Sequence, residues 1–133
     1  MNYTEITNAI KEYTDNTETT FVNNIPNFVR QTEERIYRSI LIPELRKNVT
    51  TSVTSSNRFL AKPTDFLAVF SIAVVDGSSN YSFLLPKDVN FIREAYPATG
   101  TTGLPVYYSL FDGDNFLIAP TPDSGYTVQL HYY

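Results

Sequence analysis

The spacing of apolar residues changes once along this chain of 133 residues, close to Pro43. Before Pro43 the apolar residues recur every three or four positions, as on one face of a helix, and after it they alternate with polar residues, as in a half-buried strand. Helices followed by a run of strands are typical of an α+β fold. We therefore predict a single α+β domain over residues 1–133, in which a helical hairpin or small bundle at 1–46 packs on a mainly antiparallel β part at 47–133 with one short additional helix.

The helical part is predicted to hold two helices. The first covers residues 3–14, where Asn2 and Glu5 have the spacing of a capping box. The second covers residues 18–41, after a polar break that supplies its cap. Pro26 lies inside this second segment, and proline fits only the first turn of a helix without losing a hydrogen bond. We therefore expect either two short helices or one kinked helix there.

The β part is predicted from alternating segments that are separated by turn residues. We expect three antiparallel pairs of strands and a final strand, at residues 49–53 with 59–61, 67–75 with 81–85, 105–111 with 116–119, and 126–133. A short helix is expected at residues 87–95. No turn follows the final strand, and a domain seldom ends on such a strand unless its edge is covered, so we expect these residues to be the ordered or the expressed part of a slightly longer chain.

The charges are distributed unevenly along the chain. Residues 1–62 carry eight Lys or Arg against seven Asp or Glu, whereas residues 63–133 carry two against seven, together with thirteen of the nineteen aromatic residues. Binding to duplex DNA needs clustered Lys and Arg that neutralise phosphates. DNA binding through an extended basic face is therefore not expected.

The residue inventory argues against several kinds of enzyme. The chain has no Cys and a single His, which removes disulfides, thiol nucleophiles and the ligand sets of zinc sites. No glycine motif for a dinucleotide or a phosphate is present, so no cofactor is expected. No apolar run is long enough to span a bilayer, and the N-terminus has no secretory signal, so we expect no membrane span and assembly inside a cell.

Charged residues of the second predicted helix form a regular pattern. Arg30 and Glu34 are separated by four positions, as are Glu34 and Arg38, while Arg35 lies next to Glu34. Residues at this spacing are neighbours on a helix surface. A solvated ladder of charges is expected rather than a pair of catalytic carboxylates.

Two other groups are also interpreted as structural. Asp112 and Asp114 flank a glycine, but no glutamate follows at the distance that a calcium loop requires, so a hairpin turn is expected. His131 has neither a candidate serine nor an orienting acid, so it is interpreted as a strand histidine. No catalytic or metal-binding residue is predicted.

Each tyrosine pair of the β part can place its two rings in different environments. Tyr107 with Tyr108, and Tyr132 with Tyr133, are consecutive, so one ring of each pair lies on each face of its strand. One ring can pack in the core while the other lies on the surface or in a contact between subunits. We favour core packing plus a subunit contact over a platform for sugars.

Three stretches resemble one protein family. They are FVRQTEERIYR at 28–38, LAKPTDFL at 60–67, and the run from GLPVYY at 103–108 through IAPTPD at 118–123 to the final tyrosines. In these stretches and in the order of its elements, the chain resembles, over about residues 5–133, the head-to-tail adaptor proteins of tailed bacteriophages, also called connector or tail tubular protein A-like proteins.

The resemblance implies a structural virion protein of the tail or neck, assembled in the host cytoplasm, and no enzyme. Proteins of this kind form a twelve-subunit ring that docks on the portal protein, extends the DNA channel and presents a platform for the tail nozzle protein. DNA passes through such a channel without sequence-specific binding. The docking tail that follows the last strand in the family is absent here, so we expect the isolated protein to be monomeric and to form its ring on the portal.

Two sets of residues follow as interface candidates. We expect Arg30, Glu34, Arg35 and Arg38 to make lateral contacts between subunits. We expect the hairpin region at 105–122 to contact the next tail component, with the candidates Tyr107, Tyr108, Asp112 and Asp114. The alternative is a free-standing β-rich module that binds a receptor or a glycan through surface tyrosines, and a small hydrolase using Asp or Glu is a remote third possibility.

Overall fold

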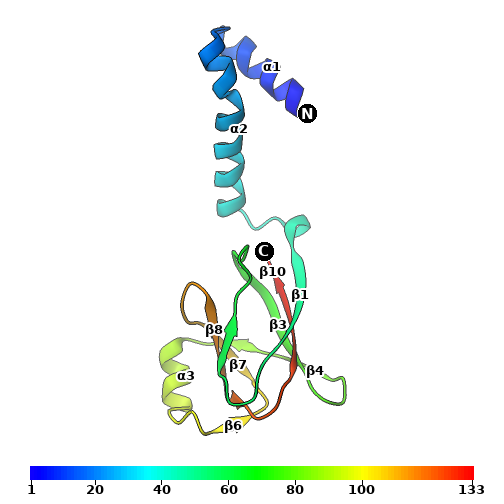
Figure 1. Cartoon of the computed structure of the whole chain (residues 1–133), viewed down its shortest axis with the longest axis vertical. Helices are drawn as coiled ribbons and strands as arrows, with labels where there is room; N and C mark the ends of the chain where they lie inside the picture. The colour runs from blue at the N-terminus through cyan, green and yellow to red at the C-terminus, as the bar shows by residue number, and fades with distance from the viewer. The chain divides into compact units, whose positions relative to one another are not determined.

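The computed structural model describes all residues from 1 to 133 and divides into two compact units, Met1–Leu41 and Ile42–Tyr133. Three α-helices and mostly antiparallel sheets make the chain an α+β protein, as predicted (Figure 1). The boundary at Leu41 lies close to the position where the apolar period changes. That the two units act as one adaptor domain stays a prediction.

The first unit consists of two helices, α1 (Tyr3–Thr14) and α2 (Thr19–Ser39). The capping box is confirmed, because Glu5 N donates to Asn2 Oδ1 at 2.9 Å and Asn2 N donates to Glu5 Oε2 at 2.8 Å. Of the two alternatives for Pro26, the structure shows a single helix with the proline inside it. The N-cap of α2 is Glu18, which follows the predicted polar break and makes no side-chain capping hydrogen bond, but Asn16 Oδ1 of that break accepts a hydrogen bond from Glu18 N at 2.9 Å.

The helical unit buries very little apolar surface. Ile25 is its one buried residue, and the half-buried apolar residues of α2 all lie between Phe21 and Val29. Every residue from Arg30 to Leu41 is exposed, including the apolar ones. The second half of α2 therefore has an amphipathic sequence whose apolar side is uncovered.

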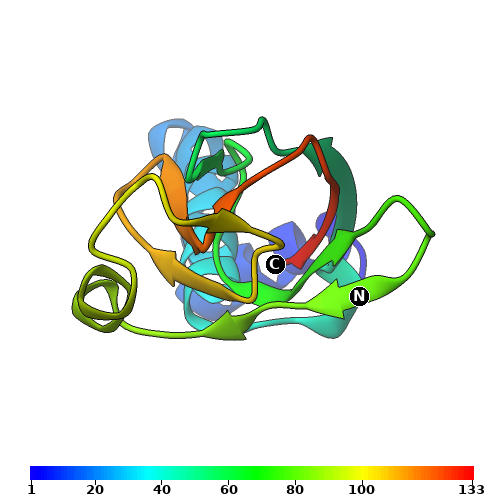
Figure 2. The ribbon, with the colours of Figure 1, turned by 90° about the horizontal axis from the view of Figure 1, so that it is seen from below.

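The second unit is a β structure with one α-helix, α3 (Val89–Ala95), and a 3-10 turn at Pro43–Leu45. Its strands are β1 (Lys47–Ser52), β2 (Phe59–Ala61), β3 (Val69–Val75), β4 (Tyr81–Phe83), β5 (Leu85–Pro86), β6 (Thr102–Gly103), β7 (Tyr107–Leu110), β8 (Asn115–Ala119), β9 (Thr121–Pro122) and β10 (Thr127–Tyr132). They form sheets in the orders β1-β10-β3-β4 and β2-β8-β7-β5, and a small pair, β6-β9. Figure 2 shows α3 at one side of this unit and the β3–β4 loop at the opposite side.

Two of the predicted strand pairs are confirmed and one is wrong. β3 pairs with β4, and β7 pairs with β8, both antiparallel. The predicted hairpin of 49–53 with 59–61 does not form, because β1 pairs with β10 and β2 pairs with β8 in the other sheet. The chain crosses between the sheets after β1, and both Val53 and Leu60 are buried in the core between them. Alternation predicted the strands correctly but could not identify their partners.

The final strand does not lie at an open edge. β10 pairs with β1 on one side and with β3 on the other. Its inward residues Val128, Leu130 and Tyr132 are buried in the core between the two sheets. β10 is therefore an inner strand, and the edge strand next to it is β1.

β8 is buried on both of its faces. Phe116 and Ile118 belong to the core between the sheets, and the Phe116 ring meets the ring of Phe66 edge-on at 5.3 Å between centroids. Leu117 and Ala119 face the other way and pack with Ile92 of α3 in a second cluster. Removing a large side chain from such a core typically costs about 3–5 kcal/mol. The short helix thus covers the outer face of the β2-β8-β7-β5 sheet.

Asp65 links the two ends of the β unit. Its carboxylate forms an ion pair with the Lys47 ammonium and accepts a hydrogen bond from the Tyr132 hydroxyl, with 2.8 Å between the oxygens. The hydrogen bond from Lys47, followed by the one from Tyr132, holds the pKa of Asp65 below its ordinary value. The same carboxylate raises the pKa of Lys47 and of Tyr132.

These shifts predict a window of pH in which Asp65 stabilises the fold. A lowered carboxyl pKa contributes stability above about pH 4, which is lost as the pH falls through the pKa of the folded protein. The raised pKa values of Lys47 and Tyr132 contribute below about pH 10, and that contribution is lost as the pH rises further. Asp65→Asn should therefore lower the melting temperature most between these limits.

Thermal unfolding of the wild type and of Asp65→Asn, followed by circular dichroism across this range of pH, measures the effect. Asp114→Asn is the matched control, because the Asp114 carboxylate accepts no hydrogen bond in the structure. A difference between wild type and Asp65→Asn that stays constant from acid to alkaline pH would contradict the prediction.

Candidate functional site

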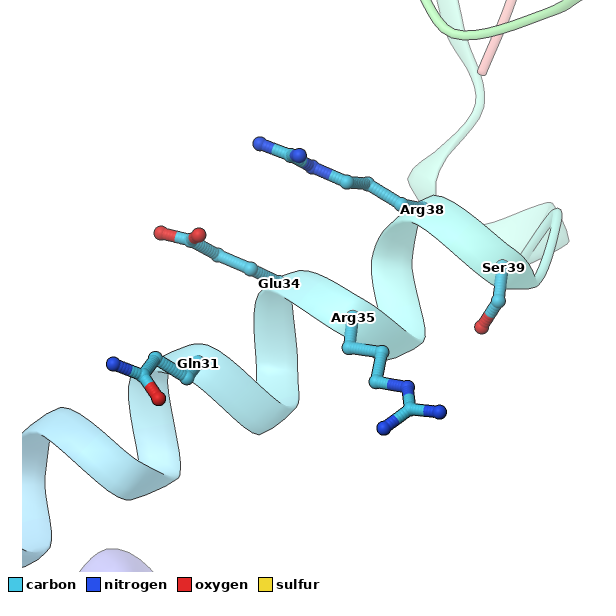
Figure 3. A pocket seen from close by; sticks show the side chains of 5 residues that line it. All are labelled: Gln31, Glu34, Arg35, Arg38 and Ser39. Atoms are coloured by element: carbon cyan, nitrogen blue, oxygen red, sulfur yellow. The ribbon is translucent and has the colours of Figure 1, made fainter.

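The charged residues of α2 form a row on the helix surface. Arg30, Glu34 and Arg38 are spaced by four residues, and Arg30 Nε lies 3.3 Å from Glu34 Oε1. Figure 3 shows Glu34 and Arg38 extending to the same side of the helix, whereas Arg35 points to another side. The structure therefore brings three of the four predicted lateral-contact residues into one row and places Arg35 beside it.

This row is open to solvent. A hollow of about 400 Å³ is lined by Gln31, Glu34, Arg35, Arg38 and Ser39, which all belong to one helix (Figure 3). The Arg30–Glu34 pair has exposed side chains, and exposed ion pairs contribute little to stability. The charges of the row are therefore available to a partner, and the arrangement does not enclose a small molecule.

Tyr107 and Tyr108 lie on opposite faces of β7, as predicted, and both are half-buried. The Tyr107 ring packs in the α3 cluster, 5.7 Å from the ring of Phe91. The Tyr108 ring meets Phe116 edge-on at 6.1 Å, and burial raises the pKa of its hydroxyl. Each face of β7 thus has its own packed cluster, and neither ring is displayed in full as a stacking platform for sugars requires.

Asp112 and Asp114 share the β7–β8 turn but have different surroundings. Asp112 Oδ1 accepts hydrogen bonds from the backbone N–H groups of Asp114 at 2.8 Å and Asn115 at 2.7 Å. The hydrogen bond from Asp114 N, followed by the one from the Asn115 side chain, holds the pKa of Asp112 below its ordinary value. Asp112 therefore shapes the turn, as the hairpin interpretation expects, while Asp114 presents an exposed carboxylate.

The four predicted tail-contact residues do not form one surface. The two aspartates lie together in the turn, while the two tyrosines are on opposite faces of the strand before it. Of these four, Asp114 is the residue with a side chain that is both exposed and free of internal hydrogen bonds.

The remaining titratable residues show no catalytic arrangement. His131 lies on β10 and stacks on Phe70 with 6.4 Å between ring centroids, and its side chain makes no hydrogen bond to an acid or a hydroxyl. Asp88 caps α3 by accepting a hydrogen bond from Asn90 N at 2.8 Å. No three side chains among His, Asp and Glu gather as metal ligands, and no helix is long and apolar enough to cross a bilayer.

A cleft of about 590 Å³ lies in the β unit between the segment before β3 and the start of α3. Its lining includes the apolar residues Phe66, Val69, Val89 and Leu110, together with Lys87 and Asp88, which form no ion pair. The Lys87 ammonium lies 5.0 Å from the centre of the Phe91 ring rather than beside a carboxylate. The cleft is mostly apolar and offers no paired acid and base.

Sequence reasoning missed an exposed group of aromatic residues on the outer face of the β1-β10-β3-β4 sheet. Phe70, Tyr81 and Phe83 are exposed there, and with His131 they surround a hollow of about 270 Å³. We call these four residues the aromatic face. The alternation of Tyr81 and Phe83 on β4 was a signal for it, but only the sheet order shows that these rings point away from the core.

The chain, with its charged helices, packed aromatic rings and no recognisable catalytic group, is similar to one known protein family. The model of the SU10 adaptor protein family matches residues 1–133, whereas no curated protein sequence matches the chain. This is a family of phage head–tail adaptors, which are structural parts of the virion and act through contacts with other virion components at the head–tail junction. The expected resemblance is thus confirmed at the level of the family, and the connector subtype stays a prediction. Since the match runs from the first residue to the last, the chain belongs to the SU10 adaptor protein family.

Proposed function

We propose that this protein forms a twelve-subunit ring beneath the portal protein, extends the DNA channel and docks the tail nozzle protein. Beside family membership, the proposal rests on how little of the helical unit is buried. Its 41 residues bury one side chain, Ile25, and leave the second half of α2 exposed on all sides. Such small units seldom have enough core to be stable alone, so neighbouring subunits are the natural source of the missing contacts.

The charges of α2 support side-by-side contacts between identical subunits. Arg30, Glu34 and Arg38 alternate in sign along one row, and Arg35 adds a positive charge at its flank. A row with both signs offers each charge an opposite partner when copies are arranged around an axis. In this proposal the four residues make the lateral contacts of the ring.

The β7–β8 hairpin is proposed to contact the tail nozzle. Its turn is held by Asp112 and ends in the exposed Asp114, while Tyr107 and Tyr108 fix its base to two packed clusters. A rigid base and an exposed, charged tip are suited to a docking contact that keeps its shape before binding. Asp114 would make the direct contact, and the two tyrosines would hold the hairpin in position.

The acidic balance of residues 63–133, which make up most of the β unit, supports a channel through which DNA slides. Residues 63–133 carry seven acidic against two basic side chains. A surface of this kind does not attract the phosphate backbone, so it offers no electrostatic trap to a moving duplex.

The ring itself is tested with purified protein and its cognate portal. Light scattering should show mainly monomer for the isolated protein at micromolar concentration, because the ring forms on the portal. Addition of portal should produce a ring that negative-stain imaging resolves beneath it. A mixture in which the two proteins remain separate at micromolar concentration would contradict the proposed function.

The α2 row is tested by charge reversal in the same assay. Arg35→Glu or Arg38→Glu should weaken assembly about tenfold or more, which corresponds to about 1.4 kcal/mol, because each places a like charge against a neighbour. The circular dichroism of the monomer should not change, since both side chains are exposed. Arg93→Glu on α3 is the control for the change in net charge, and assembly equal to wild type in both α2 variants would remove these residues from the interface.

A further inference from the structure

The outer faces of the two four-stranded sheets differ in what covers them. The outer face of β2-β8-β7-β5 is buried under α3, where Leu117 and Ala119 pack with Ile92. On the outer face of β1-β10-β3-β4, the side chains of Phe70, Tyr81 and Phe83 are 52%, 55% and 63% exposed. Strands β10, β3 and β4 lie side by side there (Figure 1). An exposed aromatic group of this kind is typical of an interaction surface.

The aromatic face surrounds a preformed hollow. Ala73 lies opposite Phe83 on β4 and Gln129 on β10, so its small side chain leaves space between the larger ones. Gln129 Nε2 donates to the Tyr81 hydroxyl at 3.2 Å and helps to fix that ring. None of the residues that line the hollow is an acid, a lysine or an arginine. The hollow is therefore suited to an apolar side chain.

A positive charge without an acidic partner borders this hollow. The Arg46 guanidinium lies 3.7 Å from the centre of the Phe70 ring and donates from Nη2 to the Tyr133 hydroxyl at 2.9 Å. Arg46 forms no ion pair, and its buried Nε has no hydrogen-bond partner. A carboxylate brought to this edge would therefore meet an unpaired cation on a stacked, fixed side chain.

The second half of α2 carries the complementary set of groups. Glu33, Ile36, Tyr37 and Ile40 follow the i, i+3, i+4, i+7 spacing that places residues on one side of a helix. Ile36, Tyr37 and Ile40 are 42%, 48% and 55% exposed, and Glu33 forms no ion pair. We call these four residues the α2 stripe, which lies on a different side of the helix from Glu34 and Arg38.

We propose that the α2 stripe of one subunit docks on the aromatic face of a second copy of the chain, with Ile36 or Ile40 in the hollow and Glu33 toward Arg46. Each chain has one stripe and one aromatic face, and both are uncovered. Identical copies satisfy both surfaces of every subunit, whereas a different partner protein would leave one of them exposed. Because the two surfaces differ, the contact is heterologous, and contacts of this kind form a closed ring when the rotation between neighbours closes, as in the proposed assembly. This inference rests on the proposed ring and names the surfaces that close it.

The absence of cysteine from the chain makes disulfide trapping a clean test. Chains with Ile36→Cys and chains with Ser71→Cys are mixed, assembled on the portal and oxidised, since Ser71 lines the hollow and tolerates a substitution of similar size. Disulfide-linked dimers that contain one chain of each kind should form at least tenfold faster than with the control pair, Gln31→Cys and Ser71→Cys. Gln31 is exposed on the same helix but lies five residues, or about 140°, from Ile36.

A chain that carries both Ile36→Cys and Ser71→Cys identifies the occupant of the aromatic face. The proposal predicts a ladder of covalent multimers on a denaturing gel. A monomer with an internal disulfide would show that the stripe docks within its own chain, and linked dimers of Ser71→Cys alone would show a face-to-face contact; either result overturns the proposal. If the ring forms but no disulfide-linked chains are trapped, the proposed docking surfaces are wrong and the proposed function still holds. If unmodified protein forms no ring at all, both proposals are wrong.

Discussion

The β unit depends on the pairing of β10 with two strands that come from far away in the sequence. β10 lies between β1 and β3, and its inward side chains fill the core between the sheets. Its end is fixed by the Tyr132 hydroxyl on Asp65 and by backbone hydrogen bonds between Tyr133 and Ala68. Without β10, β1 has no partner strand and the inner side of the sheet is open. The unit is therefore expected to fold cooperatively, once its last strand is available.

The two units differ in how much of their own apolar surface they bury. The β unit has a core between its sheets and a second cluster under α3, so β8 is buried on both sides. The helical unit has Ile25 alone, and its long helix continues beyond the part that holds its half-buried residues. A folded β unit that carries an incompletely buried helix pair is suited to an assembly protein, because the helices can gain their remaining contacts from neighbours. A well-packed β unit with an incompletely buried helical unit agrees with membership of a phage adaptor family.

Turns that depend on residues close together in the sequence were predictable. Strand partners that depend on residues far apart in the sequence were not. The β3–β4 and β7–β8 turns each contain an aspartate whose carboxylate accepts backbone hydrogen bonds within a few residues, so local chemistry predicts both hairpins. The partners of β1, β2 and β10 depend on which strands the core brings together, and alternation alone carries no such information.

The residues of the candidate site also differ in whether the sequence alone predicts their arrangement. The row of Arg30, Glu34 and Arg38 follows from helical spacing, so the sequence predicts it. The aromatic face combines residues of three strands whose order is set by long-range pairing, so it emerges only from the structure. The position of Pro26 within one helix also could not be decided, because both alternatives were consistent with the sequence.

Amide hydrogen exchange of α2 tests most directly whether the helical unit is completed by neighbouring subunits. In the isolated protein, the amides of residues 30–39 should exchange rapidly, because nothing covers this half of the helix. In the ring on the portal, the same amides should exchange at least tenfold more slowly, while the core strand β8 should be protected in both states. Exchange in the second half of α2 that is equally slow in the isolated protein and in the ring, or equally fast in both, would contradict this account.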